Sequence, residues 1–173
     1  MFEYLCKTPS DINEHLPALR DLASECTTVV EMGVRTCVST WAFIEGLKSG
    51  GTIVSIDIKE PAKYGSDLTP VEKACKNKGI NFKFYEADTL VIDIPEVDML
   101  FIDTLHTYDQ LKGELLKHGN KAKKYLVFHD TVSCENELMP AINEFMKENK
   151  KWKIKEHYKN NNGVLVLEYV NKE

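Results

Sequence analysis

The sequence predicts an α/β fold with a doubly wound, mostly parallel sheet of about seven strands and an antiparallel last strand. Short apolar, β-branched runs alternate along the chain with longer segments whose apolar residues recur at helical spacing. Several runs, such as VVEM, IVSIDI and MLFID, are typical of parallel strands buried on both faces. The chain finishes with two strand patterns joined by a loop that ends in Asn162-Gly163, a hairpin signal that makes the last strand antiparallel.

The expected strands follow from these apolar runs. They cover residues 28–32, 52–58, 81–85, 97–102, 125–128, 153–158 and 163–169. The first helix is expected over residues 10–25, packed on the rest of the domain, with Pro17 as a kink point. Three later helices begin at a capping side chain, and glycine closes the first two; their expected spans are Thr69 to Gly79, Thr107 to Gly119 and Ser133 to Met146.

Length and composition indicate one globular domain over residues 1–173. The chain is 43% hydrophobic and 28% charged, which is ordinary for a protein that buries a single core. Its net charge of -5 argues against nucleic-acid binding, which needs a basic surface. The lysine-rich stretch 147–159 fits a solvated helix end and an edge strand protected by charge.

Cysteine usage and hydropathy predict the cellular compartment of the protein. The five cysteines are an odd number and form no C-x-x-C pair, so we expect a reducing compartment without zinc or redox motifs. There is no apolar run of membrane-spanning length, and the first residues lack a signal-peptide pattern. We therefore expect a cytoplasmic protein with no membrane partner.

Polar residues follow each buried run and mark the candidate site. In an open α/β sheet, ligands bind just beyond the carboxyl ends of the strands. The residues at those ends are mainly acidic, and a buried carboxylate needs a backbone cap, a cation or a ligand hydroxyl as its partner. They are Glu31 with Gly33, Asp57, Asp88, Asp103 with His106, and His129 with Asp130.

The first three strand ends suit a nucleotide-like ligand. Gly33 allows close backbone approach to a ligand, although a tight turn with Thr36 as a helix cap explains it as well. Asp57 can accept both hydroxyls of a ribose, or it can form a turn before Pro61. Asp88 can accept from an adenine amino group, or it can form an Asx-turn.

The last two strand ends suit proton transfer or metal binding. Asp103, His106, His129 and Asp130 end two strands that are expected to be neighbours. Two acids and two imidazoles at one place can abstract a proton from a hydroxyl or hold a divalent metal. Each residue also has a simpler explanation, such as a loop cap for Asp103 or a core position for His129.

Several motifs resemble those of class I S-adenosylmethionine (SAM)-dependent methyltransferases. Residues 29–36 with Val38-Ser39-Thr40 resemble the first motif, and Asp57 in VSIDI matches the ribose-binding acid. Residues 100–103 with His106 and Tyr108 resemble an F-I-D-x-x-H-x-Y motif, and residues 126–131 resemble the end of the fifth strand. Nearly the whole chain is similar to the small-molecule and sugar O-methyltransferase group, which includes the macrolide-sugar and cephalosporin-type enzymes. The resemblance implies a Rossmann-like fold.

The resemblance also implies a reaction and a set of roles. SAM would be the cofactor, with magnesium as an optional second one, and the methyl group would move to a hydroxyl of a sugar, a glycan or another small molecule. Asp103, His106 and His129 would be catalytic, and Asp103 with Asp130 would bind the metal. The cofactor would contact Glu31, Gly33, Val34, Arg35, Ser39, Thr40, Asp57, Ile58, Asp88, Thr89 and Asp103.

The sequence departs from this group in two places and leaves two other functions open. Arg35 and Cys37 stand at positions that are often small, and His129 stands where the metal-binding members usually have an acid. One rival function is a non-catalytic nucleotide- or cofactor-binding module. The other is a nicotinamide-dependent oxidoreductase, because Gly33 and Asp57 suit that cofactor too. A homodimer would be common for such a fold.

Overall fold

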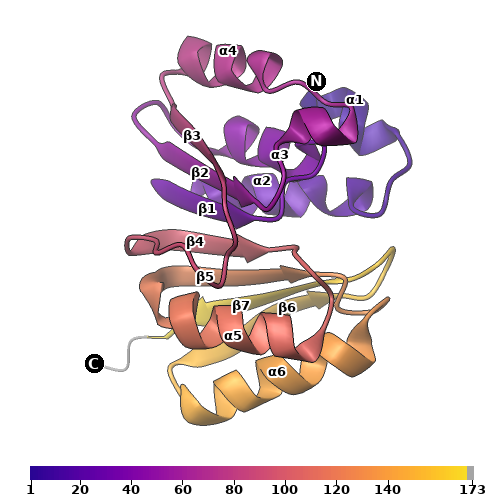
Figure 1. Cartoon of the computed structure of the whole chain (residues 1–173), viewed down its shortest axis with the longest axis vertical. Coiled ribbons are helices and arrows are strands. Elements are labelled where there is room, and N and C mark those ends of the chain that lie inside the picture. Colours follow the sequence, from indigo (N-terminus) through magenta and orange to yellow (C-terminus); the bar gives the residue numbers. More distant parts are fainter. Residues whose placement is uncertain (171–173) are drawn as a thin grey trace.

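A computed structural model describes residues 1–170 of the chain, so the last three residues of the predicted domain 1–173 lie outside the described part. Its centre is a single seven-stranded sheet in the order β3-β2-β1-β4-β5-β7-β6 (Figure 1). The strands are β1 Thr28–Met32, β2 Thr52–Asp57, β3 Asn81–Glu86, β4 Val97–Ile102, β5 Ala122–His129, β6 Trp152–Tyr158 and β7 Val164–Tyr169.

The strand directions confirm the predicted fold class. Strands β1 to β5 are mutually parallel, whereas β7 pairs antiparallel with both β5 and β6. Each crossover along the parallel part carries the chain over one face of the sheet. The carboxyl ends of β1, β2 and β4 therefore lie at one edge, where the registers pair Met32 with Ile56 and with Ile102.

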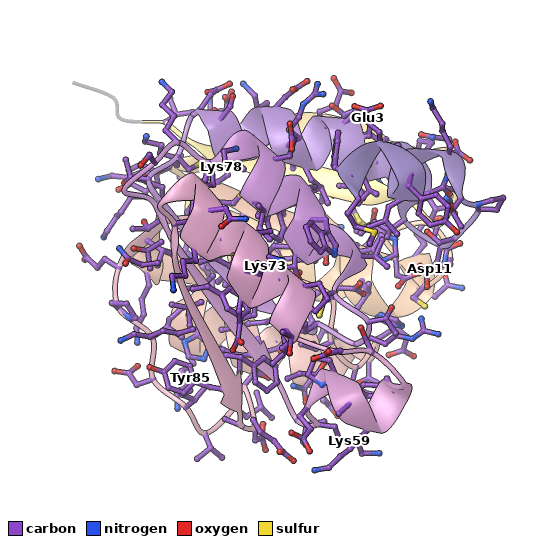
Figure 2. The ribbon with its side chains drawn as sticks, turned by 90° about the horizontal axis from the view of Figure 1, so that it is seen from above. Glu3, Asp11, Lys59, Lys73, Lys78 and Tyr85 are labelled. Atoms are coloured by element: carbon purple, nitrogen blue, oxygen red, sulfur yellow. The ribbon has the colours of Figure 1, made fainter. Side chains whose placement is uncertain are left out.

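Helices cover both faces of the sheet (Figure 1). The α-helices are α1 Phe2–Lys7, α2 Leu16–Ser24, α3 Val38–Gly46, α4 Thr69–Lys78, α5 Tyr108–His118 and α6 Glu135–Glu148. The first four share one hydrophobic core, and α5 and α6 share the other. Alternate residues of β4 point into these two cores, with Phe101 packed in the first and Leu100 in the second. In the view from above, α4 lies nearest the viewer with Lys73 and Lys78 (Figure 2).

The start of the chain differs from the prediction. The α-helix expected over residues 10–25 begins only at Leu16, after a 3₁₀ turn at Asn13–His15. Pro17 lies in the first turn of α2, where a missing amide donor costs nothing, so it starts the helix rather than bending it. The short helix α1 was not predicted, because six residues hold too little periodicity to be recognised.

Two helix caps also differ. Thr69 is the first residue of α4 rather than its cap, and the N-cap position falls on Leu68, whose side chain cannot cap; Asp67 accepts a hydrogen bond from the Thr69 backbone amide (2.8 Å). Ser133 donates its hydroxyl to Asp130, and α6 begins two residues later. The Thr107 cap and the Gly79 stop are confirmed. No helix among residues 1–170 is long and apolar enough to cross a membrane.

Candidate functional site

A cavity of about 520 Å³ opens at the carboxyl ends of the parallel strands. Most of the predicted site residues line it: Gly33, Val34, Arg35, Ser39, Asp57, Ile58, Asp88, Thr89, Asp103, His106 and Asp130. Three others, Glu31, Thr40 and His129, are buried and do not line it. The sequence analysis missed several lining residues: Asp11, Ile12, Tyr64, Ala87, Thr104, Leu105 and Gln110.

Gly33 holds the end of β1 against the end of β4. Its φ is +85°, and a Cβ atom at this position would lie 1.8 Å from the backbone oxygen of Asp103. The Gly33 amide donates to the Ile56 carbonyl (2.8 Å), and the Asp103 amide donates to the Met32 carbonyl (2.8 Å). Only glycine fits such a close approach, so the turn requires this residue even though no other glycine accompanies it.

Asp57 fixes the loop that follows Gly33. Its Oδ2 accepts hydrogen bonds from the Val34 amide (2.8 Å) and the Arg35 amide (2.9 Å), and its Oδ1 accepts one from the Lys59 amide (3.0 Å). An ionised carboxylate offers about four acceptor positions, so Oδ1 keeps one for a ligand hydroxyl. The predicted ribose contact is therefore open to Asp57, although most of its capacity serves the protein backbone.

Glu31 lies behind the cavity wall and acts on it through hydroxyl groups. Its carboxylate accepts hydrogen bonds from Ser39 (2.5 Å), Thr40 (2.8 Å) and Ser55 (2.6 Å). Complete burial raises its pKa to about 7, against the lowering effect of the three hydroxyls. Of these four residues, only Ser39 lines the cavity. Glu31 and Thr40 could therefore affect a cofactor only indirectly, by positioning residues that line the cavity.

Asp88 and Thr89 form the wall beyond β3. The Asp88 carboxylate accepts a hydrogen bond from the Leu90 amide (2.8 Å), which is the Asx-turn that the sequence allows, and the residue also lines the cavity. The buried Thr89 hydroxyl donates to Glu114 (2.5 Å). Glu114 was not predicted, because a glutamate on the inner face of a helix resembles a break in the apolar stripe.

Four charged groups meet at the other end of the cavity, as the sequence predicted. His106 Nε2 lies 3.1 Å from Asp103 Oδ1 and 2.9 Å from Asp130 Oδ2. His129 Nδ1 lies 3.3 Å from Asp103 Oδ1 and 3.1 Å from Asp130 Oδ2. Two imidazoles therefore alternate with two carboxylates, and His129 is buried while His106 is partly open to the cavity.

This arrangement charges both imidazoles at neutral pH. Interactions with Asp103 and Asp130 raise the pKa of His106 to about 10. Burial opposes the charged form of His129, but the same two carboxylates outweigh it and raise its pKa to about 10. Burial favours protonation of both acids, yet the neighbouring imidazoles hold the pKa of Asp103 and of Asp130 below the ordinary range.

The same cluster has a donor set suited to a divalent cation. Ligand atoms of Asp103, His129 and Asp130 lie within 4.8 Å of one another, as do those of His106, Asp130 and Cys134. His129 Nε2 lies 3.0 Å from the backbone oxygen of Asp11, and donation along this contact would leave Nδ1 facing the two carboxylates. One or two carboxylates are the usual protein ligands of Mg²⁺, whereas ring nitrogens favour later transition metals.

The segment before α2 closes one side of the cavity. Asp11 and Ile12 line it, and the Arg35 guanidinium pairs with the Asp11 carboxylate at 3.1 Å. The loop between β6 and β7 holds this segment, because the Asn161 side chain donates to the Ser10 carbonyl (2.9 Å). In the same loop, Asn162 donates to Asp130 (2.8 Å). Asp11 and Ile58 both line the cavity, and Asp11 and Lys59, the residue after Ile58, lie in the same half of the view in Figure 2.

Comparisons with known proteins bear on the fold. No protein-family model and no curated protein matches the chain. Among solved structures, an O-methyltransferase from Bacillus cereus in complex with SAH (S-adenosylhomocysteine) is 15% identical to this chain, with a TM-score of 0.65. The match covers 90% of this chain and 80% of the Bacillus cereus chain. A methyltransferase from Geobacter sulfurreducens is 14% identical with a TM-score of 0.68, covering 98% and 84%. The SAH-bound methyltransferase PaMTH1 from Podospora anserina is 13% identical with a TM-score of 0.59, covering 95% and 81%. The chain therefore has the Rossmann-like fold of these methyltransferases.

Proposed function

We propose that the protein is a SAM-dependent O-methyltransferase that acts on a hydroxyl group of a sugar or another small molecule. The observation that carries this proposal is the meeting of two different sets of residues in one cavity. A glycine turn with strand-end acids, Gly33, Asp57 and Asp88, lines one part, and the cluster of Asp103, His106 and Asp130 lines another. A cofactor and a proton-transfer centre would thus share one cavity. The methyltransferase fold of the solved relatives supports the same reading.

The lining residues suggest an order for the parts of SAM along the cavity. The methionine part would lie by Gly33 and Ser39, where backbone and a hydroxyl line the cavity. The ribose would meet Asp57, whose Oδ1 retains an acceptor position. The base would lie against the apolar side chain of Ile58, beside Asp88. In this order the sulfonium would lie near Asp103, whose backbone closely approaches the Gly33 turn.

The reaction requires a proton acceptor for the attacking hydroxyl. The acceptor oxygen forms a bond to the methyl carbon, the carbon–sulfur bond breaks with its electron pair going to sulfur, and the hydroxyl proton passes to a base. His106 is the imidazole of the cluster that lines the cavity, whereas His129 is buried and does not. At rest His106 is an imidazolium, because two carboxylates hold its proton.

A positive charge near Asp103 and Asp130 would release that proton. The sulfonium of a bound cofactor would oppose the imidazolium, and this would lower the pKa of His106. A divalent cation held by Asp103 and Asp130 would lower the pKa of a bound hydroxyl as a Lewis acid. In either case Asp103 and Asp130 would orient His106 through Nε2, and the acceptor hydroxyl would have to approach one of the two ring nitrogens to pass on its proton.

Polar groups at the mouth of the cavity support a hydroxylated acceptor. Asp11, Arg35 and His106 all line the cavity with charged groups that can pair with sugar hydroxyls. Leu105 is 64% exposed beside them and offers an apolar surface for the face of a ring. Sugars present hydroxyls at the ring edge and C–H groups on the ring face, and they match this combination.

Calorimetric titration with SAH, with and without Mg²⁺, tests the proposal. We expect micromolar binding by the unmodified protein and at least ~10-fold weaker binding by Asp57→Asn, because one charged hydrogen bond to the ribose is lost. Asp93→Ala is the matched control, since this exposed acid pairs with Lys121 away from the cavity. Asp103→Asn should keep the affinity for SAH within a few-fold and lose methyl transfer to hydroxylated acceptors.

The outcomes separate the proposed function from its rivals. Absence of SAH binding by the folded protein would refute the methyltransferase proposal and favour a non-catalytic module. Binding of NADH in its place would indicate an oxidoreductase. Equal SAH affinity of Asp57→Asn and the unmodified protein would remove Asp57 from the cofactor site.

A further inference from the structure

One wall of the cavity is built on a buried carboxylate that no step of the proposed reaction uses. Glu114 lies on α5 and is 0% exposed. Its three hydrogen-bond partners, Thr89, Thr104 and Gln110, all line the cavity. They come from the loop after β3, the loop after β4 and the first turns of α5. Glu114 therefore joins three separate segments of the wall.

The hydrogen bonds to Glu114 fix which way each wall group points. Glu114 accepts from the hydroxyl of Thr89 (2.5 Å) and from the hydroxyl of Thr104 (2.9 Å). Gln110 Nε2 donates to Glu114 (2.9 Å) and to the Thr89 hydroxyl oxygen (3.0 Å). Both hydroxyl protons and both amide protons are thus directed into the wall. Burial raises the pKa of Glu114, but these three partners all act in the opposite direction and favour the ionised form. An ionised carboxylate only accepts hydrogen bonds, so it holds the donors on its own side.

What remains for the cavity is a set of acceptors. The Gln110 amide has used both of its protons, and among residues 1–170 its Oε1 receives no donor from the protein. A flipped amide would place Oε1 against the Glu114 carboxylate, which is repulsive. Asp88, on the same part of the wall, also accepts but does not donate through its side chain.

The geometry points to Gln110 as the residue that selects the base of the cofactor, with Glu114 as the positioning residue that sets its orientation. Gln110 Oε1 accepts a hydrogen bond from the exocyclic amino group of a 6-aminopurine. A 6-oxopurine would bring an oxygen to the same place and would meet an acceptor. The inference rests on the proposed function, since it assumes that the nucleoside end of SAM occupies this part of the cavity.

The test compares SAH with its deaminated analogue S-inosylhomocysteine, which carries a 6-oxo group. Calorimetry on the unmodified protein should give at least ~10-fold tighter binding of SAH, the value of about one hydrogen bond. In Glu114→Gln the new amide can donate to Gln110 Oε1 and allow Gln110 to turn its amino group toward the cavity. The preference for SAH should then fall at least ~10-fold or reverse.

Two further variants make the result decisive. Gln110→Leu removes the acceptor without adding a donor, so the preference should shrink without reversing. Glu144→Gln is the matched control, because this glutamate pairs with Lys112 and Tyr108 on the outer side of α5 and α6. The ratio of the two affinities is the readout, since a purely structural defect weakens both ligands alike.

The outcomes distinguish this inference from the proposed function. If the unmodified protein binds neither ligand, the proposed function itself fails. If it binds SAH but Gln110→Leu and Glu114→Gln keep the original preference, the assignment of Gln110 and Glu114 is overturned. If Glu114→Gln does not fold, Gln110→Leu alone decides between these results.

Discussion

Replacing Gly33 with alanine separates two reasons why a turn needs glycine. Gly33 has a φ of +85°, and an added Cβ would lie 1.8 Å from the Asp103 backbone oxygen. Gly50 has nearly the same φ, +88°, but an added Cβ there would meet nothing within 4 Å. Gly50→Ala thus measures the backbone strain alone, and Gly33→Ala measures the strain together with the overlap.

The expected magnitudes follow from these distances. A left-handed conformation costs an L-residue roughly 1–2 kcal/mol, offset in part by the lower entropy of the unfolded alanine chain, which contributes about 0.4–1 kcal/mol. Gly50→Ala should therefore lower the free energy of unfolding by roughly 0–2 kcal/mol. Gly33→Ala must also separate the β1 turn from the end of β4, and overpacking of this kind costs typically about 1–3 kcal/mol more.

Urea unfolding of both variants at one pH provides the measurement. The difference between Gly33→Ala and Gly50→Ala should be roughly 1–3 kcal/mol, with an unchanged m-value. Because the shift moves the backbone of Asp103, SAH binding by Gly33→Ala should weaken as well, while Gly50→Ala binds like the unmodified protein. Equal destabilisation by the two substitutions would refute the reasoning, because the overlap with the Asp103 backbone would then add nothing to the loss of unfolding free energy.

Two other predictions concern the charged cluster and the segment that covers it. The pKa of His106 is raised to about 10, so its ion pairs stabilise the fold fully below its ordinary value near 6.5 and lose this contribution as the pH rises through about 10. The urea concentration at the unfolding midpoint should therefore decrease as the pH is raised from 7 to 10, and the decrease should be smaller in His106→Asn. The same decrease in the variant and in the unmodified protein would contradict the ion pairing. Asn161→Ala removes a hydrogen bond to the Ser10 carbonyl. Hydrogen exchange of residues 8–15 should accelerate several-fold while the strands keep their protection, and unchanged exchange there would show that the loop does not hold the segment.

The arrangement of the sheet could be predicted because its signals are local and repeated. Buried runs such as 97–102 carry apolar residues for both faces, and the structure places Phe101 and Leu100 in opposite cores. The antiparallel end follows from the loop that ends in Asn162-Gly163, which returns the chain beside β5. The first fifteen residues lack such a repeat, so α1 and the covering segment were not predicted.

The candidate site could be predicted only where the chemistry lies at strand ends. Asp57, Asp103, His106 and Asp130 were all placed on the cavity by that rule, and they line it. Asp11 lies in a loop, Tyr64 ends a short 3₁₀ helix and Gln110 lies in the first turn of α5, so the rule of strand ends does not reach them. Glu31 was placed at the correct strand end, but burial sets it behind the wall, because three hydroxyls from α3 and β2 surround its carboxylate.

Whether the hydroxyl groups that line the cavity act as hydrogen-bond donors or acceptors is the property that the sequence predicts least well. A serine or threonine hydroxyl can donate or accept, so Ser39 and Thr89 alone predict no preference for a ligand. In the structure each donates its proton to a buried glutamate, Ser39 to Glu31 and Thr89 to Glu114. The Thr89 oxygen also accepts from Gln110 Nε2 (3.0 Å), so the proton of neither hydroxyl is available to the cavity. Two buried glutamates thus remove hydroxyl donors from the two parts of the wall where, under the proposed function, the ammonium of the methionine part and the amino group of the base would lie.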